Sequence, residues 1–469
     1  MKKIINNKKF LLISFFICFS LFLCTFITKE SDYFWHIKAG DYMFNNGIIT
    51  NDIFSHSLYG KHCLSHEWLF EVFIYFLKII FGNYNMIIYP FISLFIIYLF
   101  IYLSNKDKMK KNLLFSVIWI VLSSIFMAYI QCRPHFISFI LVSITMYLLY
   151  DLINNEKSNK IYILPLLTIV WANAHGGSSN IGYLLCFLVL IVGLFKFSFD
   201  KIEAKKLSKL QIKKLLLVGV LSLISTIINP HGIQMTLYPY VNLMDNTMLT
   251  SIAEWAPTNI NNLTHLPFFV LAIFILILFL TSKKKIKFID FVLFGLGVFL
   301  GLKYIRFWPY LYIFSSYFIF NYVDEFKFNN MKYIIVFLNI LIIFMFSFSV
   351  KNINKVINKE FCFLDNKMIN LIKENKPERL FNVYDTGGEL VYHDIPVYID
   401  GRADLYSSHG ILNKYLNIIN LDYDYEELIN SGNFDYYLIN KSSKLEKYII
   451  SLGVEEIYSY KDYILYKIK

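Results

Sequence analysis

Long apolar stretches recur along most of this 469-residue chain, and they constrain its fold more than any other feature. A helix that crosses the roughly 30 Å hydrocarbon core of a bilayer needs about 20 mainly apolar residues. Segments of this kind lie near 10–28, 86–104, 113–130, 136–150, 161–174, 181–197, 215–229, 267–281, 287–302, 304–322 and 332–350. Charged residues make up only 17% of the chain, whereas about 25% is usual in soluble proteins. The sequence therefore predicts a polytopic α-helical membrane protein with about 11 transmembrane helices.

The net charge of +11 comes from lysines and arginines that cluster between the apolar runs. A nucleic-acid-binding surface would gather its basic residues on one face, so no nucleic acid partner is expected. Short cytoplasmic loops of membrane proteins collect Lys and Arg. The basic clusters occur at 2–9, 106–111, 201–214 and 283–287. They all fall on the cytoplasmic side of a cell membrane if the N-terminus is cytoplasmic, which places the end of the chain outside.

The composition changes near residue 350, where apolar runs give way to mixed polar and β-prone sequence. This change predicts a transmembrane domain over 1–350, with a large outer loop at 29–85, and a soluble extracytoplasmic α/β domain over 351–469. Within the second domain the patterns indicate strands at 379–384 and 397–399, a helix at 444–452 and a hairpin at 455–468.

Residues 67–81 of the first outer loop have the pattern of an amphipathic helix. Trp68, Leu69, Val72, Phe73, Phe76 and Leu77 recur at helical spacing. Such a helix would lie in the membrane interface. A spanning helix is the alternative, and it would invert the topology of everything that follows.

The densest group of polar side chains lies in the first outer loop. It comprises Asp32, His36, Asp52, His66 and Glu67. A carboxylate that is partly desolvated at the membrane surface can act as a general base toward a hydroxyl acceptor. Carboxylates beside histidines could also hold a divalent cation, although the spacing matches no established metal motif. The alternative is a loop anchored by Trp at the headgroup level and capped by Asp.

Ionisable residues also stand at the outer ends of later apolar runs. They are Arg133, His135, His175, His231, Glu254, Lys303 and Arg306. Charges at span ends are costly unless they face a protein interior or a cavity, and Arg and Lys are suited to holding a phosphate. For each single residue the alternative is a side chain that extends to the membrane surface. Because several loops on the predicted outer side share this feature, a common cavity is the better explanation.

Two motifs stand out in the tail, TGGEL at 386–390 and YIDGRADLY at 398–406. The strand expected before Asp400 would lead into a turn that presents Asp400 and Arg402. Paired glycines alone do not make a phosphate-binding loop. A structural Asp–Arg pair and a ligand-binding role both remain open at this stage.

Taken together, these motifs resemble the GT-C superfamily of integral membrane glycosyltransferases, and within it a bacterial branch. The matching stretches are 32–36, 66–69, 133–135, 173–176, 229–232, 254–255 and 400–406. The resemblance implies transfer of a sugar from a polyprenyl-phosphate donor to a glycan, lipid or protein acceptor outside the membrane. It implies a base in the first outer loop, Asp32 or Glu67, accompanied by His36 and His66.

By the same resemblance, Arg133, Lys303 and Arg306, with His175, would bind the donor phosphate. The remaining outer residues, Asp52, His135, His231, Glu254, Asp400 and Arg402, complete the expected outer face. Two alternatives stay open. One is a transporter or lipid flippase, which should carry helix-breaking or ionisable residues near midspan. The other is an envelope-assembly scaffold that uses the cavity without catalysis.

Overall fold

The structure is a computed structural model, and it describes residues 7–28, 30–324, 331–357 and 362–468. Lys2 and Lys3, which contributed to the topology prediction, lie outside these ranges. Contacts divide the chain into two compact units. We call them the helical unit, Met1–Thr28 with Asn83–Pro239 and Ile252–Asn358, and the mixed unit, Lys29–Gly82 with Tyr240–Ser251 and Lys359–Lys469.

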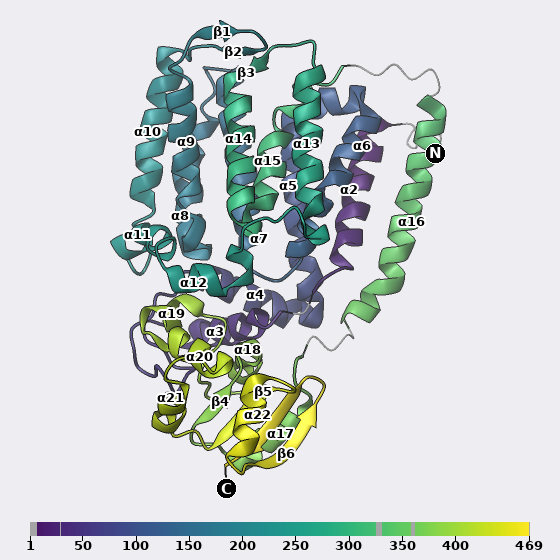
Figure 1. The fold of residues 1–469 in the computed structure, drawn as a ribbon. Coiled ribbons are helices and arrows are strands. Elements are labelled where there is room, and N and C mark those ends of the chain that lie inside the picture. Colours follow the sequence, from purple (N-terminus) through teal and green to yellow (C-terminus); the bar gives the residue numbers. More distant parts are fainter. Residues whose placement is uncertain (1–6, 29, 325–330, 358–361, 469) are drawn as a thin grey trace. The chain divides into compact units, whose positions relative to one another are not determined.

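The helical unit is a bundle of apolar helices, several of which run side by side in Figure 1. Its α-helices are α2 (Lys8–Cys24), α5 (Asn85–Lys111), α6 (Leu113–Leu122), α7 (His135–Asn154), α8 (Leu164–Ala174), α9 (Ile181–Val192), α10 (Lys209–Ser225), α11 (Ile233–Asn242), α13 (Leu266–Thr281), α14 (Phe288–Lys303), α15 (Trp308–Ser316) and α16 (Met331–Ile357). A small sheet joins β1 (Phe197–Phe199), β2 (Ile202–Ala204) and β3 (Ile286–Lys287).

Short 3-10 helices extend or connect these helices. They are η2 (Ser123–Tyr129), η3 (Lys160–Ile163), η4 (Gly176–Ser178), η5 (Ala253–Trp255), η6 (Leu263–His265), η7 (Ile305–Phe307) and η8 (Ile319–Asn321). Each predicted apolar run contains a helix of this unit. Among the described residues, four stretches are long and apolar enough to cross a membrane: Trp68–Lys111, His135–Asn154, Leu263–Thr281 and Lys332–Asn354. The total number of spans stays a prediction.

The first of these stretches contains two helices, α4 (Trp68–Phe81) and α5, separated by the 3-10 turn η1 (Gly82–Tyr84). Gly82 has a φ of 56°, a left-handed conformation that interrupts the helix. With 14 residues, α4 is about 21 Å long, shorter than the roughly 30 Å core of a bilayer. The 27 residues of α5 are sufficient. We therefore treat α5 as the membrane-spanning part and α4 as part of the mixed unit.

The mixed unit is built around a four-stranded sheet in the order β4-β5-β7-β6. Its strands are β4 (Leu380–Asn382), β5 (Tyr436–Asn440), β6 (Glu455–Tyr460) and β7 (Tyr463–Lys467). The pair β4 and β5 is parallel, and the other two pairs are antiparallel. Its helices are α3 (Asp32–Asn46), α4, α12 (Asn246–Ser251), α17 (Asn366–Asn375), α18 (Tyr384–Tyr392), α19 (Ala403–Ser408), α20 (Ile411–Asn420), α21 (Tyr425–Gly432) and α22 (Lys444–Ser451).

One hydrophobic core joins the first loop to the tail. Trp35, Ala39 and Met43 of α3 belong to the same buried cluster as Tyr437 and Leu438 of β5. The sequence-based division assigned the loop 29–85 to the membrane domain, whereas contacts group residues 29–82 with the tail. The loop is thus a structural component of the folded tail.

Glycines allow α3 and the tail to come together closely. A Cβ on Gly388 would lie 2.2 Å from the carbonyl oxygen of Ser31, just before α3. A Cβ on Gly387 would lie 2.2 Å from the carbonyl oxygen of Ile399. The paired glycines of the TGGEL motif therefore lie inside α18 and act in packing, since no larger residue fits there.

The tail confirms two predicted elements and corrects a third. The helix expected at 444–452 is α22, and the hairpin expected at 455–468 is formed by β6 and β7. The strand expected at 397–399 is wrong, because this segment makes only an isolated bridge between Val397 and Ser55. The Asn382 side chain replaces a neighbouring strand, since its amide donates to the Ile399 carbonyl oxygen and its carbonyl accepts from the Tyr398 N–H.

The strand expected at 379–384 is shorter than predicted. Only Leu380–Asn382 pairs with β5, and α18 begins at Tyr384. The helix expected at 67–81 is present as α4, but its packed face differs from the predicted one. Phe70, Glu71, Ile74 and Leu77 are buried, whereas Phe73 and Phe76 are exposed.

Candidate functional site

A cluster of acidic and imidazole groups forms where α3 and α4 pack together in the mixed unit. Asp32 and His36 are four residues apart on α3, so they share one helical face. Glu67 and Glu71 are also four residues apart, at the start of α4. Gly40 permits the close approach, since a Cβ there would lie 2.1 Å from the Glu71 carbonyl oxygen. The spacing on both helices therefore directs ionisable groups into one interface.

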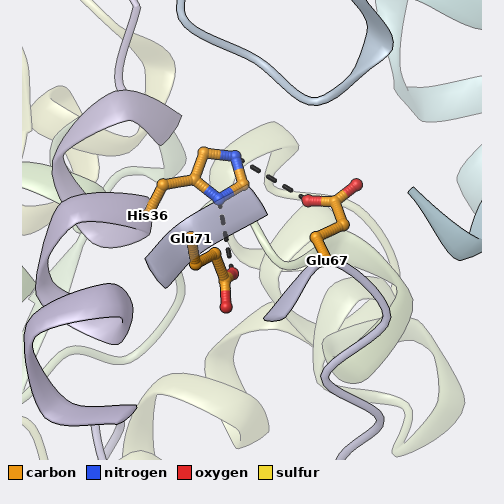
Figure 2. Close-up of side chains that lie close together, drawn as sticks. All are labelled: His36, Glu67 and Glu71. Atoms are coloured by element: carbon orange, nitrogen blue, oxygen red, sulfur yellow. Dashed lines mark hydrogen bonds and ion pairs between the residues drawn. The ribbon is translucent and has the colours of Figure 1, made fainter. Parts of the chain in front are cut away.

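The imidazole of His36 lies between the two glutamates, as Figure 2 shows. Its Nδ1 is 3.3 Å from Oε1 of Glu71, and its Nε2 is 3.8 Å from Oε2 of Glu67. All three residues are buried, with exposed fractions of 2%, 5% and 9% for His36, Glu71 and Glu67. The Trp35 ring lies 3.8 Å from the His36 ring, centroid to centroid. Packing therefore holds the imidazole in place.

The cluster continues on the other side of Glu67. Nε2 of His66 lies 3.2 Å from Oε1 of Glu67, and its Nδ1 lies 3.6 Å from Oδ2 of Asp404 on α19. Burial disfavours the charged imidazole, but the Glu67 and Asp404 carboxylates outweigh it and raise the pKa of His66 to about 9. Burial, followed by repulsion from Glu67, raises the pKa of Glu71 to about 8. Glu71 therefore favours the protonated, neutral form at neutral pH, and His66 favours the charged form.

Asp32 lies against the tail beside this cluster. A Cβ on Gly401 would lie 1.8 Å from Oδ1 of Asp32 and 2.9 Å from Nε1 of Trp35. The Asp32 backbone N–H donates to Oε1 of Glu30. Gly401 of the YIDGRADLY motif has no side chain. Its absence leaves space for the Asp32 carboxylate and the Trp35 indole nitrogen.

Asp400, Arg402 and Asp52 form a buried ion-pair network. The Arg402 guanidinium donates two hydrogen bonds to Asp400, of 2.9 and 2.6 Å, and a third of 2.5 Å to Oδ1 of Asp52. Tyr406 donates to Asp400, and Ser55 donates to Asp52 from both its backbone and its hydroxyl. Burial opposes ionisation, yet Arg402 and Ser55 lower the pKa of Asp52. The network links the first loop to the tail.

A second group of predicted residues gathers in the helical unit. Arg133 pairs with Glu254, and the Arg306 guanidinium lies 4.2 Å from the ring centroid of Trp255. Burial disfavours the charged carboxylate, but Arg133 and then Arg306 lower the pKa of Glu254. His135 is hydrogen-bonded to the Tyr129 carbonyl oxygen, 2.9 Å away. The loops before α7 and α15 thus place two arginines around one carboxylate.

The other predicted residues of the helical unit are His175, His231 and Lys303. His175 is buried, with Nδ1 2.6 Å from the Ser138 hydroxyl and 2.9 Å from that of Ser178. The His231 backbone N–H donates to Asn229, within the turn before α11. Lys303 ends α14, with its Nζ 5.1 Å from the ring centroid of Tyr304.

The sequence reasoning missed Glu71. Its position four residues after Glu67 was a usable signal, because both side chains then lie on one face of a helix. The predicted packed face of α4 included Phe73 and Phe76 but not Glu71, which the structure buries. Among the described residues, His36, Glu67 and Glu71 are the group able to hold a metal ion, with one ligand atom of each within 4.8 Å of the others.

Comparison with known proteins adds evidence at the level of fold. No protein-family model and no curated protein matches the chain. Solved structures of the oligosaccharyltransferase of Archaeoglobus fulgidus do match. Its apo form has a TM-score of 0.55 at 11% identity, over 92% of this chain and 69% of that one, and the form tethered to an acceptor peptide gives the same values.

The same archaeal enzyme, AglB, has also been solved with an inhibitory peptide and a dolichol-phosphate. That structure has a TM-score of 0.56 at 12% identity, over 98% of this chain and 74% of that one. The match and the apolar helices identify a polytopic membrane protein with a C-terminal domain. The resemblance seen in the motifs is thereby confirmed for the architecture: the chain has the fold of AglB, an archaeal oligosaccharyltransferase.

Proposed function

We propose that this protein is a membrane glycosyltransferase that moves a sugar from a polyprenyl-phosphate donor to an extracytoplasmic acceptor. The observation that carries the proposal is the buried cluster of His36, Glu67 and Glu71, one helical turn from Asp32 on α3, on a chain with the AglB fold. A carboxylate whose pKa is raised by burial can act as a general base near neutral pH. The acceptor is a hydroxyl or amide of a glycan, lipid or peptide.

In the proposed reaction the acceptor atom attacks the anomeric carbon with inversion. A new bond forms between that carbon and the acceptor, and the bond between the carbon and the phosphate oxygen breaks. Asp32 takes the acceptor proton, with Glu67 as the alternative base. The bonding electrons leave with the polyprenyl phosphate, whose charge Arg133, Lys303 and Arg306 stabilise.

The proposal includes an orientation in the plasma membrane. The N-terminus is cytoplasmic, about eleven helices cross the bilayer, and residues 351–469 lie outside. The basic clusters between the apolar runs support this arrangement, since Lys and Arg concentrate in cytoplasmic loops.

The test is transfer activity in membranes supplied with lipid-linked sugars, measured by mass spectrometry of the products. Removing the base should lower turnover by about 10²-fold or more, so Asp32→Asn or Glu67→Gln should show that loss. Arg306→Gln should also reduce turnover, whereas Asp41→Asn, on the same helix as Asp32, should not. Full transfer by both Asp32→Asn and Glu67→Gln would refute the mechanism and favour a binding-only function such as lipid translocation.

A further inference from the structure

A cavity of about 230 Å³ lies at one end of the helical unit. It is lined by the ends of α7 and α9, the starts of α10 and α14, and residues of β2 and β3. Figure 1 shows the small sheet at this end of α9, α10 and α14. Pockets for drug-sized ligands usually have roughly 300–1,000 Å³. This cavity is therefore suited to a smaller group.

Backbone contacts hold the walls of the cavity in place. The Leu207 N–H, between β2 and α10, donates to the carbonyl oxygen of Gly193 at the end of α9, over 2.8 Å. A Cβ on Gly193 would lie only 2.3 Å from Cδ1 of Leu207, so the glycine permits this contact. The Gln211 amide donates to the carbonyl oxygens of Leu152 and Ile153 in α7. The cavity is thus a product of the folded bundle.

Three lysines and one glutamate are the ionisable residues that line this cavity. Glu203 and Lys287 are register partners on the parallel strands β2 and β3, so their side chains lie on one face. Nζ of Lys205 lies 3.3 Å from Oε1 of Glu203, and Lys206 follows it in the chain. Asp290 is buried, accepts hydrogen bonds from two tyrosine hydroxyls and does not line the cavity. The lining therefore attracts an anion.

An aromatic surface adjoins the same cavity. Phe288 lines it, and the Phe288 ring lies 5.9 Å from the ring of Phe195 and 5.1 Å from that of Phe197, centroid to centroid. Phe195 and Phe197 are half-exposed, and Phe199 of β1 is 78% exposed. Large apolar side chains beside basic ones are typical of segments that lie in the headgroup region of a bilayer. The cavity is therefore continuous with a surface that lipid can cover.

We propose that this cavity binds the phosphate-bearing head group of an anionic phospholipid. Lysine ammonium groups bind phosphate as point charges, and basic pockets between transmembrane helices suit anionic head groups. The acyl chains would lie against the aromatic surface of Phe195, Phe197 and Phe199. A free phosphate would share the charge but make no use of that surface. The proposed membrane orientation decides only which leaflet supplies the lipid.

The test uses full-length protein in detergent, freed of lipid by washing and titrated with dioleoyl phosphatidylglycerol. Native mass spectrometry should detect one tightly bound phosphatidylglycerol per chain and no phosphatidylcholine at the same concentration. The double variant Lys206→Gln with Lys287→Gln should weaken binding by about tenfold or more. The control Lys209→Gln with Lys213→Gln removes as much charge from exposed positions of α10 outside the cavity, and it should bind as wild type does.

Two outcomes of this titration would overturn the proposal. Equal weakening by the two double variants would show that the attraction is diffuse and not a property of the cavity. Displacement of the lipid by an equal concentration of inorganic phosphate would assign the cavity to a free anion.

A measurement on the wild-type chain covers the case in which a variant does not fold. Phosphatidylglycerol with a photoreactive group near its phosphate should cross-link to residues 203–211 or 287–289, which peptide mass spectrometry locates. Cross-links that lie only elsewhere would refute the site. Because no sugar donor or acceptor is present, the result is independent of the proposed transfer: an inactive protein that passes both tests retains the lipid site.

Discussion

Arg402 joins two carboxylates that are fully buried. Asp400 precedes it by two residues, and Asp52 comes from the first loop, 350 positions away. A guanidinium presents its donors in a rigid fork, so it can serve both carboxylates at once. The DGR motif thus has a structural role that accounts for its charged residues without a ligand.

Removing this cation should be costly, because two buried carboxylates would lose their partner. We expect Arg402→Gln to lower the free energy of unfolding of the mixed unit by about 3–5 kcal/mol. Thermal denaturation in detergent measures the change. The exposed Arg379 supplies the matched control, and Arg379→Gln should cost less than about 1 kcal/mol. Equal melting temperatures for Arg402→Gln and Arg379→Gln would contradict the stabilising role assigned to the network.

The same network predicts a dependence on acid. The pKa of Asp52 is lower in the folded chain than its ordinary value of about 3.9. A carboxyl of this kind stabilises the fold above its unfolded pKa, and the stabilisation is lost as the pH falls through the folded pKa. The wild-type melting temperature should therefore drop below about pH 4. Asp52→Asn should melt lower at neutral pH and show a shallower drop, and parallel curves for the two proteins would exclude Asp52 as a cause.

At the scale of elements, the sequence predicts where helices occur better than it predicts how the elements pack together. The apolar runs predicted the helices of the bundle because each run must either be buried in the protein or face lipid along its whole length. The strand predicted at 397–399 failed because a side chain, that of Asn382, takes the place of a neighbouring strand. Local pattern does not reveal a partner that lies 16 residues away in sequence.

The candidate site was predictable in part for similar reasons. Asp32, His36, His66 and Glu67 were recognised because polar groups are conspicuous beside apolar runs. Glu71 was not predicted because it lies within an apolar helix. Only its contact with His36 of α3 shows that it belongs to the cluster. The pairing of Asp52 with Arg402 was also not predictable, since it depends on a contact between the first loop and the tail.

At the scale of the whole molecule, the proposed orientation makes a prediction for intact cells. Single cysteines introduced at Ser451, in the tail, and at Lys285, between α13 and α14, should differ in reactivity. A membrane-impermeant maleimide should label the Ser451→Cys protein in intact cells, because the tail is expected outside. It should label the Lys285→Cys protein only after permeabilisation. Labelling of both in intact cells, or of neither, would require another topology.

The core shared by residues 29–82 and the tail has a consequence for biosynthesis. The ribosome makes α3 and α4 long before it makes β5, so Trp35 and Met43 emerge without the surfaces that later cover them. At about 5–20 residues per second, the 354 residues between Phe81 and Tyr436 take roughly 18–70 s. During this interval the early segment has to be sheltered by lipid or by a chaperone, and its maturation can finish only after β5 has been made.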